Sequence, residues 1–153
     1  MTAILDGREI ARAIEAEQLA RTARATARGI HPCLAVMVCG DDSPSHVYGA
    51  MIRRGCERVG IQFRVHELPV NIGRAAAIAA VERLNADAAV HGIIVKRPLP
   101  GDLADEALLQ RIAPMKDADG CHFENVGRLV AGATDAGPIP CTPAGVVELL
   151  IRT

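Results

Sequence analysis

Cys33-Leu-Ala-Val-Met-Val-Cys39 is a continuous apolar run that lies between Pro32 and Gly40. A short run of this kind, bounded by helix-breaking residues, is typical of a strand buried on both faces of a parallel sheet. A second apolar run spans Val90 to Val95. Ile61 to Glu67 instead alternates apolar and polar residues, which predicts a strand with one wetter face. The sequence therefore predicts three strands.

Helical segments separate these strands. Asp6 is a good helix cap, and apolar residues recur at helical spacing after it as far as Ala27. Gly60 is a suitable terminator for a second helix. That second helix is expected at residues 45–59, and further helical patterns predict helices at residues 74–85 and 106–112. This alternation predicts a three-layer α/β/α fold with a mainly parallel sheet, formed by residues 1–153 as a single domain.

The composition bounds the class of protein. The chain has 153 residues, of which 50% are hydrophobic and 23% charged, with a net charge of -1. That balance fits one globular domain with a core, and it offers no basic stripe for a nucleic acid. Five cysteines without a paired spacing argue against a disulfide framework and a structural metal site. No run of apolar residues approaches the length of a membrane span, so we expect a cytoplasmic protein.

The C-terminal third is less regular. Residues 124–140 are rich in Gly, Ala and Pro and are expected to form a loop or a weak hairpin. Thr142 and Pro143 suit the cap and first turn of a final helix. No Gly-x-Gly-x-x-Gly follows a predicted strand, and no Gly-Lys-Ser/Thr occurs. The chain is therefore expected to have no dinucleotide-binding domain and to hold no NADP by itself.

Three polar segments follow predicted strands or begin helices, at residues 40–48, 96–100 and 117–122. Ligands in parallel sheets bind outside the carboxyl ends of the strands, so we expect these segments to share one cleft. Lys96 lies at a strand end before a Pro-Leu-Pro turn. It is either a solvated lysine or a group that acts as an acid or base, or that holds a carboxylate or carbonyl oxygen.

Other candidates also have a structural alternative. Asp117 and Asp119 either bond their own turn, or one of them accepts hydrogen bonds from an amino-pyrimidine-like ring. Tyr48, the only tyrosine, either belongs to the core or stacks on a flat ligand. Cys121 and Cys141 lack the order of partners that marks a nucleophile and are expected to be buried small residues. Arg53 and Arg54 are expected on a solvated helix face.

Several motifs in one order resemble the folate-binding catalytic domain of the methylenetetrahydrofolate dehydrogenase/cyclohydrolase family. These motifs are Leu5-Asp-Gly7, Gly40-Asp-Asp-Ser-Pro-Ser-His-Val-Tyr48, Leu84-Asn-Ala-Asp87, Gly92-Ile-Ile-Val95, Pro98-Leu-Pro100, Lys116-Asp-Ala-Asp-Gly120, Asn125-Val-Gly127 and Pro140-Cys-Thr-Pro143. The resemblance covers nearly the whole chain. It implies binding of 5,10-methylene- or 5,10-methenyl-tetrahydrofolate.

The resemblance also implies which residues form the site. In the family, a tyrosine is followed four residues later by a catalytic lysine; here Tyr48 is present, and Ile52 occupies the lysine position. The family's glutamine is replaced by Lys96, and its ligand-binding aspartate falls on Asp119. We expect Lys96 and Asp119 to be catalytic, with Lys96 supplying the cation that Ile52 cannot. The expected folate-binding set is Tyr48, Ile52, Val95, Lys96, Arg97, Pro98 and Asp119, and no metal is expected.

Three functions fit this pattern. The first is a stand-alone folate enzyme that opens or hydrolyses the imidazolidine ring, or passes the one-carbon unit to a second small-molecule substrate in a Mannich or Pictet-Spengler type condensation, without hydride transfer. The second is a fragment of a bifunctional dehydrogenase/cyclohydrolase. The third is a catalytically silent folate-binding subunit. Because apolar surfaces that a neighbouring domain covers in relatives would be exposed here, we also expect a homodimer.

Overall fold

A computed structural model describes residues 5–40, 43–99, 103 and 105–153, without the side chains of residues 43–48 and 105. The predicted alternation of helices and strands is confirmed. In chain order the elements are α1 (Gly7–Ala27), β1 (Cys33–Cys39), α2 (Ser43–Arg58), β2 (Gln62–Leu68), α3 (Arg74–Ala86), β3 (Gly92–Val95), α4 (Asp105–Leu109), the 3-10 helix η1 (Pro114–Lys116), α5 (Phe123–Val130), the 3-10 helix η2 (Thr134–Ala136) and α6 (Cys141–Ile151).

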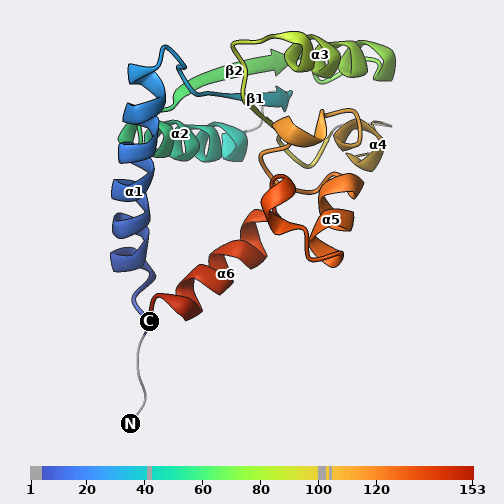
Figure 1. Cartoon of the computed structure of the whole chain (residues 1–153). Coiled ribbons are helices and arrows are strands. Elements are labelled where there is room, and N and C mark those ends of the chain that lie inside the picture. The colour runs from blue at the N-terminus through green and yellow to red at the C-terminus, as the bar shows by residue number, and fades with distance from the viewer. Residues whose placement is uncertain (1–4, 41–42, 100–102, 104) are drawn as a thin grey trace.

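The sheet is parallel and has the strand order β2-β1-β3. The apolar run of β1 is therefore the central strand, and it is largely buried, as the prediction of a buried strand requires. Helix α3 covers one face and α2 lies across the other, which gives the three expected layers (Figure 1). On the α3 face, Ala35 and Met37 are fully buried with Val81 and Ile93. β2 is an edge strand among the described residues. Its apolar Val65 remains 36% exposed, whereas its polar neighbour His66 is partly buried, so the burial of this strand departs from the predicted alternation at these two positions.

Helix α1 begins where the sequence indicates. The carboxylate of Asp6 accepts a hydrogen bond from the backbone N–H of Arg8, at 2.9 Å, and so satisfies one of the free N–H groups of the first turn. At the other end of the chain, α6 runs back toward the start of α1 (Figure 1). Arg152 joins the two helices by an ion pair with Glu17, with Nη1 and Oε1 2.6 Å apart.

The prediction of a loop or weak hairpin over residues 124–140 is wrong in its first half, which lies in α5. His122 caps this helix by accepting the N–H of Glu124 at Nδ1. The buried side chain of Asn125 donates to the carbonyl of Pro114, at 2.8 Å, and fixes α5 to the core. Helix α6 also begins earlier than predicted, at Cys141. These tertiary contacts override the weak helical propensity of a Gly- and Val-containing segment.

No helix in the described part of the chain is long and apolar enough to cross a membrane.

Candidate functional site

A cavity of about 660 Å³ lies at the carboxyl end of β3. Parallel sheets usually bind ligands at this edge. The residues that line it are Ile94, Val95, Lys96, Arg97, Asp119, Cys121, Pro140, Cys141, Thr142 and Pro143. The structure thus brings together four of the predicted folate-binding positions. Ile52 and Pro98 are not among the described residues that line the cavity, and the side chain of Tyr48 lies outside the described part.

The end of β3 positions the two cations of the cavity. Val95 is buried, and the N–H of Lys96 donates to the carbonyl of Met37, at 2.9 Å, so that the strand pairing extends to Lys96. The Lys96 ammonium donates to the carbonyl of Arg97 at 3.2 Å. A cis peptide bond then joins Arg97 to Pro98. The half-buried Lys96 and the exposed Arg97 therefore reach the cavity from consecutive positions.

In the Lys-Asp-Ala-Asp-Gly segment, Lys116 and Asp117 form hydrogen bonds that stabilise the fold, and Asp119 lines the cavity. Lys116 donates to the carbonyls of Asn85 and Asp87, at 2.7 and 2.8 Å, and so closes the end of α3. Asp117 is buried and accepts the N–H of His122, at 2.7 Å. Only Asp119 lines the cavity. The turn interpretation therefore holds for Asp117, whereas Asp119 lines the cavity.

Gly120 lets the two walls of the cavity meet. Its φ is +68°, and a Cβ at this position would lie 2.3 Å from the carbonyl carbon of Ile139. No side chain fits such an approach. The N–H of Cys141 donates to the carbonyl of Asp119, at 3.3 Å, and holds the start of α6 against this segment. The close contact at Gly120 therefore places residues 140–143 at the wall of the cavity.

The environment of Asp119 raises the pKa of its carboxyl group. Burial raises the pKa of this carboxyl group, the charge of Asp117 raises it further, and Arg97 opposes both effects. A carboxyl group shifted in this direction can hold and release a proton more readily than an exposed aspartate. The cavity therefore combines a carboxyl group of raised pKa with two cationic side chains.

The two cysteines of the cavity are not activated nucleophiles. Burial is the main cause that raises the pKa of both the Cys121 and the Cys141 thiols, and the charge of Asp119 adds to it. The Cys141 thiol donates to the carbonyl of Ala118, at 3.1 Å. The prediction that both are buried is wrong, since Cys141 is exposed and Cys121 only partly buried. Both line the cavity where the start of α6 contacts residues 118–121.

Sequence reasoning did not name Ile94, Pro140, Thr142 and Pro143 as site residues, although all four line the cavity. The Pro-Cys-Thr-Pro motif was the available signal for the last three, because it ends a loop and starts a helix. Among the described residues, no group of three His, Cys, Asp or Glu side chains is arranged to hold a metal ion.

The fold is an open parallel α/β domain with a cavity at the carboxyl edge of its sheet, the place where such sheets usually bind ligands. Residues 5–119 match the catalytic domain of the tetrahydrofolate dehydrogenase/cyclohydrolase family. The chain belongs to this family, as its motifs predict.

Relatives and solved structures agree with this assignment. The chain is 44% identical over 147 residues to the bifunctional protein FolD of Anaeromyxobacter dehalogenans, with 96% of this chain and 52% of that protein covered. The match to FolD of Heliobacterium modesticaldum is 45% identical over 149 residues and covers 97% and 51%. The crystal structure of the bifunctional enzyme FolD from Campylobacter jejuni superposes with a TM-score of 0.94 at 37% identity, covering 98% of this chain and 53% of that one.

The chain therefore spans about half the length of the curated relatives it matches. The comparisons favour the second of the three predicted functions, a segment of a bifunctional dehydrogenase/cyclohydrolase, over the stand-alone enzyme. A dehydrogenase-cyclohydrolase of Trypanosoma brucei, 35% identical with a TM-score of 0.89, was crystallised with NADP and an inhibitor; this chain covers 52% of it, and the match spans 99% of this chain. No dinucleotide-binding unit is present among the residues that the structure describes.

Proposed function

We propose that this domain binds 5,10-methylene- or 5,10-methenyl-tetrahydrofolate in the cavity at the carboxyl end of β3. Membership of the tetrahydrofolate dehydrogenase/cyclohydrolase family supports a folate as the ligand, and the cavity supports the location of its binding site. The observation that carries the proposal is the joint presence of Lys96, Arg97 and Asp119 on one cavity of about 660 Å³. That volume is within the range that proteins use for ligands of this size.

Asp119 is the proposed recognition group for the pterin ring. The ring's amino-pyrimidine edge presents N–H donors in one plane, and a carboxylate offers two acceptor oxygens that match them. Partial burial excludes water from this carboxyl group and strengthens hydrogen bonds to it. The raised pKa of Asp119 also suits it to proton transfer at the same ring.

Lys96 is the proposed cation for the one-carbon centre. Ile52 can neither carry charge nor donate a hydrogen bond, so the lysine implied by the family is missing from α2. Lys96 brings an ammonium group into the cavity from β3 instead. A lysine beside the imidazolidine ring can donate a proton to the departing nitrogen, which opens the ring, or assist a water molecule that attacks the methenyl carbon.

The ring-opened methylene iminium is an electrophile, and an amine or carbon nucleophile of a second substrate could capture it as an alternative to hydrolysis. Arg97 supports recognition of an acceptor that carries a carboxylate, because its guanidinium lies at the same cavity and suits such a group. We assign no NADP to these 153 residues, since no dinucleotide motif follows any of their strands. The proposal therefore contains no hydride step within this domain.

The test is turnover of 5,10-methenyl-tetrahydrofolate, followed by its absorbance without nicotinamide. General acid-base groups contribute about 10²- to 10⁴-fold, so Lys96→Gln should lower the rate by at least about 100-fold. Arg24→Gln, an exposed charge on α1, is the matched control and should retain the full rate. Unchanged turnover in Lys96→Gln would remove Lys96 from the chemistry.

A silent folate-binding domain is the second candidate, and Ile52 is the observation that favours it. This alternative shares the binding site but not the chemistry. It requires that wild-type protein binds the folate and returns it unchanged with every acceptor tested. Ile52→Lys would then be expected to create cyclohydrolase activity where none existed.

Self-association remains a prediction. Four apolar side chains on α6 are exposed, namely Val146 and Val147 at 53% each, Leu150 at 62% and Ile151 at 69%. An apolar surface of this kind is usually covered by a partner or by further protein. Sedimentation velocity of the 153-residue protein measures the state directly. We expect a dimer that Leu150→Asp converts to a monomer, and a monomeric wild-type protein would contradict the prediction.

A further inference from the structure

A second and larger cavity lies on the same sheet, and none of the described residues lines both this cavity and that of the proposed folate site. It is a groove of about 1110 Å³ between α2 and the edge strand β2. Its apolar floor comes from Val36, Val38, Phe63 and Val65. This volume is slightly above the usual range of about 300 to 1,000 Å³ for small-molecule sites. The groove is therefore large enough for a ligand of its own.

The floor follows from strand register. Val36 pairs with Val65 on β2 and with Ile94 on β3, and side chains at paired positions lie on one face of a sheet. Val65 lines the groove, whereas Ile94 lines the folate cavity. The two cavities therefore occupy the same sheet face, with the groove on the β2 side.

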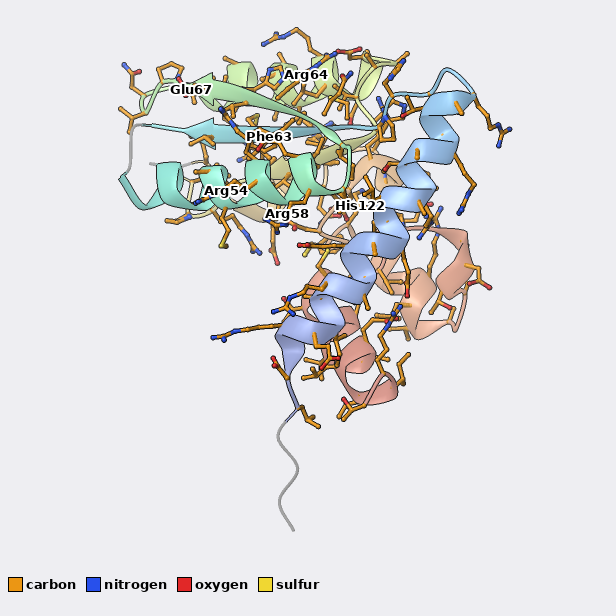
Figure 2. All side chains as sticks on the ribbon, turned by 90° about the vertical axis from the view of Figure 1, so that its left-hand side faces the viewer. Arg54, Arg58, Phe63, Arg64, Glu67 and His122 are labelled. Atoms are coloured by element: carbon orange, nitrogen blue, oxygen red, sulfur yellow. The ribbon has the colours of Figure 1, made fainter. Side chains whose placement is uncertain are left out.

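Charged groups of both signs border this apolar floor. Arg53 and Arg54 come from α2, and Glu67 comes from the carboxyl end of β2. Figure 2 labels Arg54 and Glu67 on these two elements. The guanidinium carbon of Arg53 lies 5.4 Å from the centre of the Phe63 ring. The Nε of Arg54 donates to the carbonyl of Ala50, at 3.3 Å, which leaves its terminal nitrogens for other partners.

These charges do not neutralise one another. Within the described part of the chain, Glu67 forms no ion pair with either arginine. A carboxylate and a guanidinium that face the same apolar groove at a distance can be bridged by a ligand that carries both complementary charges. An anion alone would leave Glu67 opposed by like charge, and a cation alone would meet two guanidinium groups.

We propose that this groove binds a small zwitterion with an apolar body, of the class of α-amino acids with aromatic or branched side chains. The ligand carboxylate pairs with Arg54, and its ammonium group pairs with Glu67. The apolar body covers Val36, Val65 and the ring of Phe63. Burial of that body supplies affinity, whereas the two charges supply orientation and selectivity. The inference does not depend on the proposed folate function.

The test uses three probes of one shape. L-phenylalanine carries both charges, 3-phenylpropanoate lacks the ammonium group, and 2-phenylethylamine lacks the carboxylate. Binding to wild-type protein is followed by chemical shifts of backbone amides, without folate. We expect L-phenylalanine to shift amides of β2 and α2, and each probe that lacks one charge to bind at least about tenfold more weakly, a difference of about 1.4 kcal/mol.

Variants separate the site from the fold. Arg54→Met and Glu67→Gln should each weaken L-phenylalanine by at least about tenfold. Arg64→Met is the control, because Arg64 points to the opposite face of β2 and pairs with Asp87. Folate binding should be unchanged in the groove variants, which distinguishes this site from the other. Two results would overturn the proposal. One is the absence of a saturable shift with L-phenylalanine up to about 10 mM, which limits the binding free energy to about 3 kcal/mol or less. The other is equal binding of all three probes.

Discussion

Gly120→Ala should damage both stability and the folate cavity, because Gly120 has two separate reasons to be glycine. Its backbone has a φ of +68°, which L side chains rarely adopt. A methyl group there would also lie 2.3 Å from the carbonyl carbon of Ile139 and 2.5 Å from the nitrogen of Pro140. Both contacts are with backbone atoms, so no side-chain rotation relieves them.

Gly132→Ala separates these two effects. Gly132 has a φ of +74°, but a Cβ there meets nothing within 4 Å. The free energy of unfolding of Gly132→Ala should therefore fall only by the cost of the left-handed conformation, about 1 to 2 kcal/mol. Gly120→Ala should lose that amount and, in addition, about 1 to 3 kcal/mol for displacing residues 139–140. The total of about 2 to 5 kcal/mol lowers the melting temperature by roughly 5 to 15 °C in a chain of this length.

Thermal unfolding of wild type, Gly120→Ala and Gly132→Ala measures the difference. Since Asp119 and Cys141 meet at this contact, Gly120→Ala should also weaken binding of 5,10-methenyl-tetrahydrofolate, whereas Gly132→Ala should not. Equal melting temperatures for the two variants would refute the argument, because they would show that the contact with Ile139 costs nothing.

Three further predictions concern Lys116, Asp119 and Cys141, which lie in or against the segment around Gly120. Lys116→Met should destabilise the protein by about 2 to 4 kcal/mol in urea unfolding, because three carbonyls at the end of α3 lose a charged donor; a loss below about 0.5 kcal/mol would contradict this role. The pKa of Asp119 is raised above 3.8, so the folded state holds this proton more tightly and loses stability as the pH rises through the folded pKa. Asp119→Asn should therefore melt higher than wild type at neutral pH, with a gap that closes toward about pH 4, and a lower melting temperature at neutral pH would contradict the shift. Alkylation of Cys141 by iodoacetamide should be slow at pH 7 and rise with pH until it levels off above the raised pKa of the thiol, which lies higher than the ordinary 9.0; rapid reaction at neutral pH would show an activated thiolate and contradict the shift.

The sheet was predictable because its determinants are local. The apolar run of β1 predicts a largely buried strand, and the structure confirms it. The alternation of β2 correctly predicts a strand, but its apolar Val65 is exposed and its polar His66 is partly buried. Residues 124–140 show the limit of this approach. Helix α5 depends on Asn125 bonding to Pro114 and on His122 capping Glu124, which are contacts between segments that composition does not reveal.

The candidate site was predictable only in part, for a similar reason. Residue type and position left Lys96, Asp117 and Asp119 with structural alternatives, and the resemblance to the family assigned the ligand-binding role to Asp119. The folded chain shows the physical difference, because the carboxylate of Asp117 accepts hydrogen bonds from His122 and Asn125. The wall formed by residues 140–143 depends on a backbone contact at Gly120, which no local pattern encodes.

Folate binding at the cavity lined by Lys96 and Asp119 is the central claim to test. The direct measurement is a titration of the 153-residue protein with 5,10-methenyl-tetrahydrofolate, with Asp119→Ala and the exposed control Asp135→Ala in parallel. We predict saturable binding by wild type and Asp135→Ala, and a loss of at least about tenfold in Asp119→Ala, equal to about 1.4 kcal/mol. Absence of binding by wild type, or equal affinity in all three proteins, would contradict the central claim.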